Sequence, residues 1–438
     1  RTVSRGLGDV YKRQGRSKSA KEKSSKKENY KEKSNKKEII SHYLAYFYLY
    51  KLMNPEFLSP VKESIVAHLV SQSNQTLGKK IQIYSQKDDF PDLENIQIAI
   101  FGVQEDRNSE DNFGCGENLG LIREKLYQLL PGNWHTNIAD LGNILKGDSV
   151  SDTYFAVSEI ITSLLKKNII PVIIGGGQDI TYVNYRAYDS LEQTVNITAV
   201  DSRFDFGNLE DELTSQSYLS KIIMQEPNNL FNYCNVGYQT FFNSQEEIEL
   251  LNNLFFDAYR LGEAKDLEII EPAFRNADIV SIDIGAVRQS EAPANNNASP
   301  NGFYGDEICA ISRYAGISDK VSSFGIYEYN SKYDNNYQTA HLIAQMIWYF
   351  IEGVNYRVKD YPFTVKEDYQ KFTVLLEDDD PLTFYKSHKT GRWWIEINIL
   401  SDNKYKRHAL IPCTHQDYID ATNEIIPQKW FKAMRKLI

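Results

Sequence analysis

Cysteine and histidine are scarce in this chain, and their positions exclude several common kinds of site. The 438 residues include four cysteines, which stand far apart and form no Cys-x-x-Cys pair. This spacing excludes a disulfide framework and a cysteine-ligated zinc site, and it indicates the reduced thiols of a cytoplasmic protein. The seven histidines all lie outside residues 136–340. The middle of the chain therefore offers no histidine ligand of its own.

A long apolar run and a basic body are also missing. The apolar and aromatic segment at 39–52 has only 14 residues, which is too short to span a bilayer. Residues 1–40 contain 14 Lys and Arg against 5 Asp and Glu, a net +9, so the remainder carries −19 of the total charge of −10. An acidic body argues against nucleic acid as a partner. We therefore expect this protein to bind neither membrane nor nucleic acid.

The first 52 residues are predicted to be a disordered or artefactual leader. Residues 18–38 are a low-complexity mixture of Lys, Ser and Glu, which is typical of disorder. Residues 1–14 resemble a peptide translated from sequencing-adaptor remnants, and Met53 offers a start for the mature chain. A signal peptide is the competing interpretation, but no small-x-small cleavage site follows the apolar run.

Three apolar segments end in glycine-rich or polar tips, as strands do where they lead into a functional site. The first runs into Gly-Gly-Gly-Gln-Asp at 175–179, the second into Asp-Ser-Arg-Phe-Asp at 201–205 and the third into Asp-Ile-Gly at 283–285. The carboxyl ends of strands are where α/β folds place their ligands. Asp201 and Asp205, four residues apart across a strand-to-loop turn, can converge on one divalent ion.

These three strand ends, in this order, resemble the ureohydrolase family of arginases, agmatinases and formimidoylglutamases. The family carries Gly-Gly-x-His, Asp-Ala-His-x-Asp and Ser-x-Asp-x-Asp motifs, which together hold two manganese ions. This chain has Gly-Gly-Gly-Gln at 175–178, Asp-Ser-Arg-Phe-Asp at 201–205 and Ser-Ile-Asp-Ile-Gly at 281–285. The resemblance covers about residues 96–353, and ordered matches are a stronger sign than any one motif.

A fourth match lies further along the chain. Tyr-Glu-Tyr-Asn at 327–330, with Asp334 and Thr-Ala at 339–340, is similar to the family's Glu-x-Asn-Pro-x-x-Asp and Thr-Ala segment. The glutamate of that segment contacts the amidine group of the substrate in the family. The resemblance therefore implies that Glu328 positions an amidine.

The chain departs from the family at three of the six metal ligands. Both histidine ligands are replaced, by Gln178 and Arg203, and the last aspartate is Gly285. The resemblance implies that one ion would keep four oxygen ligands, which suit a hard cation such as Mn²⁺ or Mg²⁺: Gln178, Asp201, Asp205 and Asp283. The second ion loses the ligands at Arg203 and Gly285, so a two-metal cluster is not expected.

The charges of these residues also favour at most one ion. Three aspartates and Arg203 sum to −2, which one divalent ion would neutralise. Arg203 then occupies the space of the second ion and supplies part of its charge. The alternative is a metal-free network in which Arg203 pairs with the three aspartates, since buried acids need such a partner. Either arrangement lacks the hydroxide held between two metals on which the family's chemistry depends.

Strand and helix signals alternate from residue 96 to 353, which predicts repeated βα units. Such units form a mostly parallel sheet with helices on both faces, and the resemblance selects the arginase-like three-layer α/β/α sandwich. Residues 53–95 are assigned to an N-terminal segment of this core and residues 354–438 to a C-terminal α+β extension. We predict one long helix at 246–261. The loop at 288–304 has no secondary-structure signal and is expected to lie over the pocket.

Two functions follow from the resemblance. In the first, hydrolysis of a linear amidine C–N bond is impaired or lost, and the protein is a non-catalytic arginase-fold chain whose pocket takes a small amidine or amino-acid-like ligand. The alternative is an active single-metal hydrolase of the formimidoylglutamase type, in which Arg203 substitutes electrostatically for the lost ion. By resemblance a homo-oligomer is also expected.

A third interpretation takes the glycines at 175–177 as a phosphate-cradling loop before a helix. The GxGxxG spacing is missing, and three glycines after a strand are more typical of close packing at a turn.

Overall fold

The structure, a computed structural model, describes most of the chain beyond the leader. The chain divides into two units, Arg1–Asn54 and Pro55–Ile438, and the predicted leader at 1–52 lies outside the described residues. No helix in the described part is both long enough and apolar enough to cross a bilayer. The described residues are 54–191, 193–207, 212–360, 366–376, 381–397 and 408–437.

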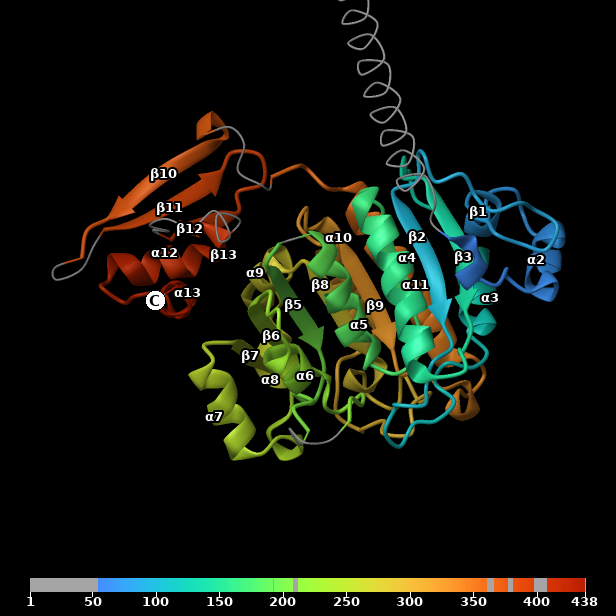
Figure 1. Cartoon of the computed structure of the whole chain (residues 1–438). Coiled ribbons are helices and arrows are strands. Elements are labelled where there is room, and N and C mark those ends of the chain that lie inside the picture. The colour runs from blue at the N-terminus through green and yellow to red at the C-terminus, as the bar shows by residue number, and fades with distance from the viewer. Residues whose placement is uncertain are drawn as a thin grey trace, which may run out of the picture. The chain divides into compact units, whose positions relative to one another are not determined.

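A nine-stranded parallel sheet forms the centre of the second unit (Figure 1). Its strand order is β1-β3-β2-β4-β9-β8-β5-β6-β7, and every neighbouring pair is parallel. The central strands are continuous apolar runs because helices cover both faces. The strands are β1 (Gln82–Ile83), β2 (Ile98–Val103), β3 (Ile138–Ile144), β4 (Ile170–Ile174), β5 (Val195–Val200), β6 (Leu230–Tyr238), β7 (Asp257–Arg260), β8 (Ile279–Asp283) and β9 (Ser323–Tyr327).

Two groups of helices pack against the sheet, and the helices of each group contact one another. The first group is α4 (Val150–Lys166), α5 (Ile180–Arg186) and α6 (Tyr218–Met224). The second is α3 (Gly120–Gln128), α9 (Leu267–Asn276), α10 (Gly305–Ile317) and α11 (Gln338–Asn355). Local sequence sets the start of α4, where Ser149 and Asp152 form a capping box. The predicted three-layer sandwich is confirmed.

The helix predicted at 246–261 is wrong in its second half. Helix α7 covers only Gln245–Asn253, and Phe255 then takes a left-handed φ of 57°, which a helix does not contain. The following residues form the edge strand β7, paired with β6. Backbone pairing with an existing strand here outweighs the local helical pattern.

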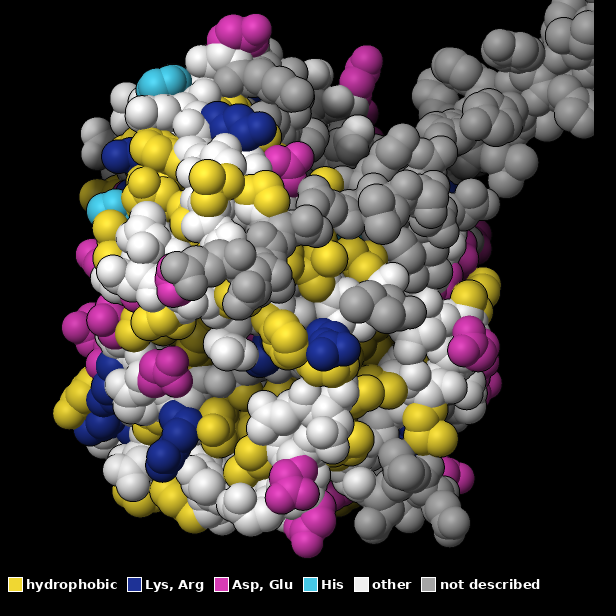
Figure 2. All heavy atoms as spheres, turned by 90° about the vertical axis from the view of Figure 1, so that its left-hand side faces the viewer, with side chains coloured by type: hydrophobic (Ala, Val, Ile, Leu, Met, Phe, Trp, Pro, Cys, Tyr) yellow, Lys and Arg dark blue, Asp and Glu magenta, His cyan; other side chains and the backbone are white. Residues whose placement is uncertain are grey.

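The C-terminal extension is an α+β unit, as predicted. Its sheet is antiparallel, in the order β10 (Tyr369–Val374), β11 (Leu382–Ser387), β12 (Trp393–Glu396) and β13 (Leu410–Cys413), and it is followed by α12 (His415–Thr422) and α13 (Gln428–Arg435). Arg275 of α9 donates to the carbonyls of Trp393 (2.8 Å) and Cys413 (3.0 Å). Figure 2 shows the face that carries this extension, where charged side chains of both signs are dispersed among hydrophobic ones.

Candidate ligand and metal site

The predicted site residues follow four strands that are neighbours at the centre of the sheet, β4, β9, β8 and β5. Because these strands are parallel, their carboxyl ends meet at one edge, where the chain's crossovers diverge to the two sides. One cavity at this edge is lined by five of the six predicted residues: Gln178, Arg203, Asp205, Asp283 and Glu328. The sixth, Asp201, is buried beside Asp205 and Gln178.

A glycine turn carries the chain from β4 into the site. Gly175 and Gly176 take left-handed φ values of 79° and 77°. A side chain at Gly176 would also meet the Glu105 carbonyl oxygen 2.8 Å from its Cβ. The backbone N–H of Gln178 donates to Glu328 Oε1 at 2.9 Å, and the N–H groups of Gly175 and Gly177 donate to backbone carbonyls. The glycines thus form a tight turn in which the N–H groups of Gly175, Gly177 and Gln178 already have acceptors within the protein.

Three aspartates concentrate negative charge in the cavity. Asp201 Oδ1 accepts a hydrogen bond from the Arg203 N–H at 2.8 Å, and Asp283 Oδ1 accepts one from the Gly285 N–H at 2.8 Å. Asp201 Oδ2 and Asp205 Oδ2 are buried and have no hydrogen-bond partner among the described residues. Burial raises the pKa of all three carboxyls, and the charge of Asp201 raises those of Asp205 and Asp283 further.

Arg203 is not among the arginines that form ion pairs in the described part of the chain, so the direct salt bridges of the predicted metal-free network are not formed there. Its charge nevertheless opposes the rise in the pKa of Asp201, Asp205 and Asp283. Its guanidinium carbon lies 4.5 Å from the centre of the Phe242 ring. The Arg203 carbonyl accepts a hydrogen bond from Asn235 Nδ2 at 2.7 Å, which fixes the backbone. The contact that the guanidinium makes is thus a cation–π contact with Phe242, which also lines the cavity.

Glu328 is held as a fixed part of the cavity wall. Its Oε2 accepts hydrogen bonds from Ser109 Oγ and Asn112 Nδ2, both at 2.7 Å, while its Oε1 accepts the Gln178 N–H. Burial raises the pKa of its carboxyl. Its φ of 67° is left-handed, a conformation that costs on the order of 1 kcal/mol outside glycine. The strained backbone and three donors orient this carboxylate before any ligand arrives.

Two asparagines from the loop at 288–304 complete the cavity. Asn295 and Asn297 line it, and Asn295 Nδ2 lies 3.5 Å from Asp283 Oδ1. The prediction that this loop lies over the pocket is therefore confirmed. The space open to the centre of a water-sized sphere is about 30 Å³, enough for about two waters, a small ion or the cationic end group of a ligand whose remainder stays outside the cavity.

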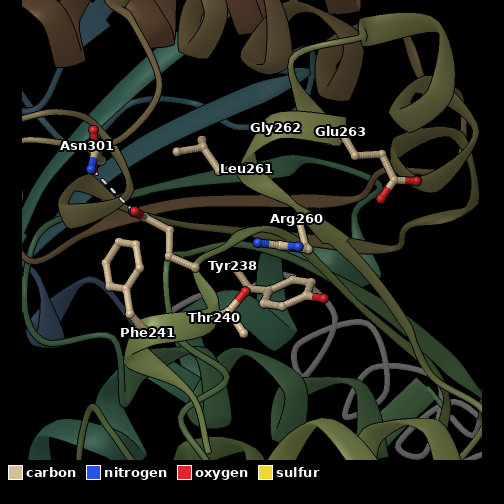
Figure 3. A pocket seen from close by; sticks show the side chains of 9 residues that line it. Tyr238, Thr240, Phe241, Arg260, Leu261, Gly262, Glu263 and Asn301 are labelled. Carbon is tan, nitrogen blue, oxygen red and sulfur yellow. Dashed lines mark hydrogen bonds between the residues drawn. The ribbon is translucent and has the colours of Figure 1, made fainter. Parts of the chain in front are cut away.

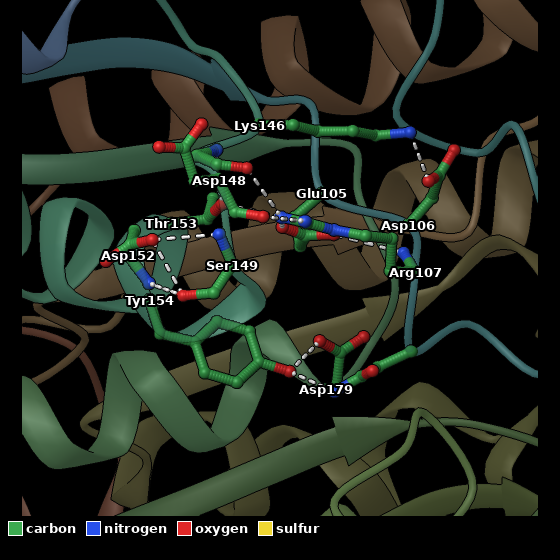
Figure 4. Close-up of polar contacts among 12 residues, drawn as sticks. Glu105, Asp106, Arg107, Lys146, Asp148, Ser149, Asp152, Thr153, Tyr154 and Asp179 are labelled. Carbon is green, nitrogen blue, oxygen red and sulfur yellow. Dashed lines mark hydrogen bonds and ion pairs between the residues drawn. The ribbon is translucent and has the colours of Figure 1, made fainter.

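A polar network supports the glycine turn from behind (Figure 4). Asp179, which follows Gln178, accepts a hydrogen bond from the Tyr154 hydroxyl at 2.5 Å, and burial raises the pKa of Asp179 to about 7. Arg107 binds Glu105 through two nitrogens, at 2.6 and 2.9 Å. The loop after β2, the start of α5 and helix α4 are thereby tied together around the turn.

The residues do not fit two metal ions. Gly285 offers no side chain, and Arg203 turns its guanidinium toward Phe242, so two ligand positions of the second ion are lost. A single cation finds a partial fit, since the unpaired oxygens of Asp201 and Asp205 and the amide of Gln178 are donors of the type that hard cations prefer. Within the described ranges, however, no group of three or more His, Cys, Asp or Glu side chains is arranged to hold a metal.

The parallel α/β/α sandwich and the acidic cavity at the carboxyl ends of its central strands agree with the ureohydrolase class that the sequence motifs predict. The chain belongs to the arginase family, whose model matches residues 96–352. It is similar to the formimidoylglutamase of Geobacillus sp. strain WCH70, with 26% identity over 313 residues that cover 66% of this chain and 94% of the relative. The formimidoylglutamase of Streptococcus gordonii is 23% identical over 291 residues, 59% of this chain and 85% of the relative. The chain is a divergent, formimidoylglutamase-like member.

Solved structures confirm the fold. The crystal structure of formimidoylglutamase from Bacillus subtilis matches with a TM-score of 0.58 at 20% identity and covers 65% of this chain and 92% of that one. Formiminoglutamase from Trypanosoma cruzi with Mn²⁺ matches with a TM-score of 0.56 at 19% identity and covers 60% of this chain and 95% of that one. That solved structure contains Mn²⁺.

Sequence reasoning missed several residues that shape the site. The Phe242 ring lies against the Arg203 guanidinium, and Ser109 and Asn112 donate hydrogen bonds to the Glu328 carboxylate. The two donors come from a loop rich in Gly, Asn and Asp, and this composition was the only signal of a functional role. Phe242 offers no sequence signal, because it meets Arg203 only through the pairing of β5 with β6.

Proposed function

We propose that this chain no longer performs two-metal hydrolysis and keeps its acidic cavity as a binding site for a small cationic ligand of amidine or amino-acid type. The observation that carries the proposal is the pair of buried carboxylate oxygens, Asp201 Oδ2 and Asp205 Oδ2, without a partner among the described residues. A buried carboxylate without a partner is costly, so a cation or a proton has to neutralise it.

The arrangement of the cavity supports an organic cation. Asp283 and Glu328 add two further carboxyl groups, and the Arg203 guanidinium lies over the Phe242 ring at the cavity wall. An amidinium is planar and donates several N–H bonds, which carboxylates accept in pairs. Glu328, held by three donors, offers a fixed surface against which such a group would lie.

The alternative is a single-metal hydrolase. It is favoured by the same unpaired oxygens together with the Gln178 amide, which would hold one Mn²⁺ or Mg²⁺. When bound, such an ion would supply a polarised water, and this chain's Glu328 would orient the amidine. With one ion the pKa of the water falls less than with two, so turnover slower than that of a two-metal enzyme is expected.

The decisive experiment measures binding and turnover separately on the full chain. N-formimidoyl-L-glutamate is titrated by calorimetry, and ammonia or formamide release is followed with and without Mn²⁺. N-acetyl-L-glutamate, which lacks the cation, is the matched control ligand. We expect saturable binding of the formimidoyl compound, weaker binding of the control and no release. Release that requires Mn²⁺ would establish the alternative, and absence of both binding and release would refute both functions.

A triple reversion tests whether the replaced ligands are the cause. The variant Gln178→His, Arg203→His, Gly285→Asp restores the family's six ligands. A Cβ at Gly285 would lie 3.2 Å from Asn295 Nδ2 and from both carboxylate oxygens of Asp283, so small shifts of these two side chains are needed to accommodate it. We expect the variant to bind more Mn²⁺ per chain than the parent. An unchanged metal content would show that the cavity has diverged beyond these three positions.

A further inference from the structure

A second and larger cavity lies beside the acidic one and is used by neither function above (Figure 3). The space open to the centre of a water-sized sphere is about 690 Å³, against about 30 Å³ in the acidic cavity. Its walls come from the end of β6, the residues that follow it and the start of helix α8 (Leu261–Ala264). The two cavities share no lining residue, so the second is a separate site.

The second cavity presents one cation and one anion. Arg260 and Glu263, three residues apart, are both exposed and both line it. Neither is among the arginines and glutamates that form ion pairs in the described ranges, so both charges remain available to a ligand. A ligand that carries a carboxylate and an ammonium on one carbon could satisfy both.

The remainder of the lining is apolar and open. Phe241, a ring normally buried, is 67% exposed, and Tyr238 and Leu261 face the same space (Figure 3). At Gly262 no atom lies within 4 Å of the position that a Cβ would take. The missing side chain leaves this part of the cavity free, and an apolar group of a ligand would cover the exposed ring.

We propose that this cavity is a binding site for a free α-amino acid with an apolar side chain. Arg260 binds the carboxylate, Glu263 binds the ammonium, and the side chain lies against Phe241 over Gly262. The proposal is independent of what the acidic cavity binds.

The site lies directly behind the motif that carries the aspartates. The Tyr238 ring packs on Phe204, the residue between Arg203 and Asp205, with ring centres 4.9 Å apart. The Phe241 ring packs on the Phe242 ring, with ring centres 4.7 Å apart, and the Phe242 ring contacts the Arg203 guanidinium. An occupant of the second cavity therefore touches two rings, one packed on Phe204 of the aspartate motif and the other on Phe242, which lines the acidic cavity.

The test uses the full chain and three probes: L-phenylalanine, 3-phenylpropanoate without the ammonium, and 2-phenylethylamine without the carboxylate. Binding is measured by calorimetry. We expect L-phenylalanine to bind about fivefold more tightly than either analogue, the factor that one exposed ion pair contributes. Equal affinity of the three probes, or no saturable binding of L-phenylalanine, would overturn the proposal.

Two variants at one position locate the ligand. Gly262→Leu fills the open space and is expected to weaken L-phenylalanine binding at least about tenfold, a loss of the size that 1.4 kcal/mol gives. Gly262→Ala, the matched control, is expected to retain most of it, and thermal unfolding checks that both variants fold. Asp201→Asn, in the acidic cavity, is expected to leave this binding unchanged. Binding that survives Gly262→Leu, or that is lost in Asp201→Asn, would place the amino acid elsewhere.

The same variants separate a ligand from a second copy of the chain. Sedimentation of the parent and of Gly262→Leu, with and without L-phenylalanine, shows whether the apolar cavity is covered by self-association. We expect the amino acid to bind without changing the mass of the particle. Association that Gly262→Leu abolishes, together with no binding of L-phenylalanine, would mean that the occupant is another chain and would overturn the proposal.

Discussion

Replacing Asp205 with asparagine should stabilise the metal-free protein at neutral pH. Asp205 is buried, its Oδ2 has no partner among the described residues, and its pKa is raised well above the usual range by burial and by the charge of Asp201. Because the folded-state pKa is higher, the folded protein holds this proton more tightly than the unfolded chain. The stability that the protonated Asp205 carboxyl contributes is complete below a pH of about 4 and is lost as the pH rises through the folded-state pKa of this carboxyl.

The expected gain follows from the unpaired oxygen. A buried acceptor without a partner costs about 1–3 kcal/mol, and a charged one costs more. In Asp205→Asn the new amide can donate to Asp201 Oδ2, which also lacks a described partner. Asparagine tolerates the left-handed φ of 57° at this position. We therefore expect about 1–3 kcal/mol of added stability at pH 8 and little difference at pH 4.

The assay is urea unfolding, followed by tryptophan fluorescence at several pH values in EDTA, because a bound cation would neutralise the same charge. The midpoints of the parent and of Asp205→Asn are compared. Asp89→Asn, at an exposed position, is the matched control and is expected to change the midpoint little at any pH. A lower midpoint for Asp205→Asn at pH 8 would refute the reasoning, since it would mean that the carboxylate already has a compensating partner.

Three further substitutions test other parts of the structure. Gly176→Ala should destabilise the fold by several kcal/mol, through both a left-handed φ and a backbone clash, whereas Gly391→Ala, with a similar φ but open space, should cost about 1 kcal/mol in urea unfolding. Arg275→Ala removes two hydrogen bonds to carbonyls of the C-terminal sheet and should expose that sheet to limited proteolysis, while an unchanged digestion pattern would contradict this role. Asp179→Asn should raise the urea midpoint above about pH 7, where the buried carboxyl of the parent loses its proton, and should change it less at pH 4.

The centre of the fold could be predicted from the sequence, and its edges could not. The runs at β4 and β5 are buried on both sides, so their apolar residues are continuous and their ends unambiguous. β7 has a mixed burial pattern and follows α7 closely, so its residues resemble the end of a helix. What identifies β7 as a strand is its pairing with β6, a contact that local sequence does not record.

The same limit applies to the site. The proximity of the motif residues could be predicted from the sequence, because the four central strands that precede them end at one edge of the sheet. The direction of the Arg203 side chain could not be predicted. Its charge alone suggests a salt bridge with the aspartates, whereas in the structure its guanidinium lies over the ring of Phe242. The donors to Glu328, Ser109 and Asn112, lie 219 and 216 residues away in the chain, and no periodicity connects positions so distant.

The central claim is that the family's two-metal centre is lost in this chain. The most direct test is the manganese content of the full chain by elemental mass spectrometry, after incubation with excess Mn²⁺ and removal of free metal by gel filtration. The account predicts no more than one ion per chain, because Arg203 and Gly285 supply no ligand for a second. Two manganese ions per chain would contradict it and would restore the two-metal hydrolase as the function of this protein.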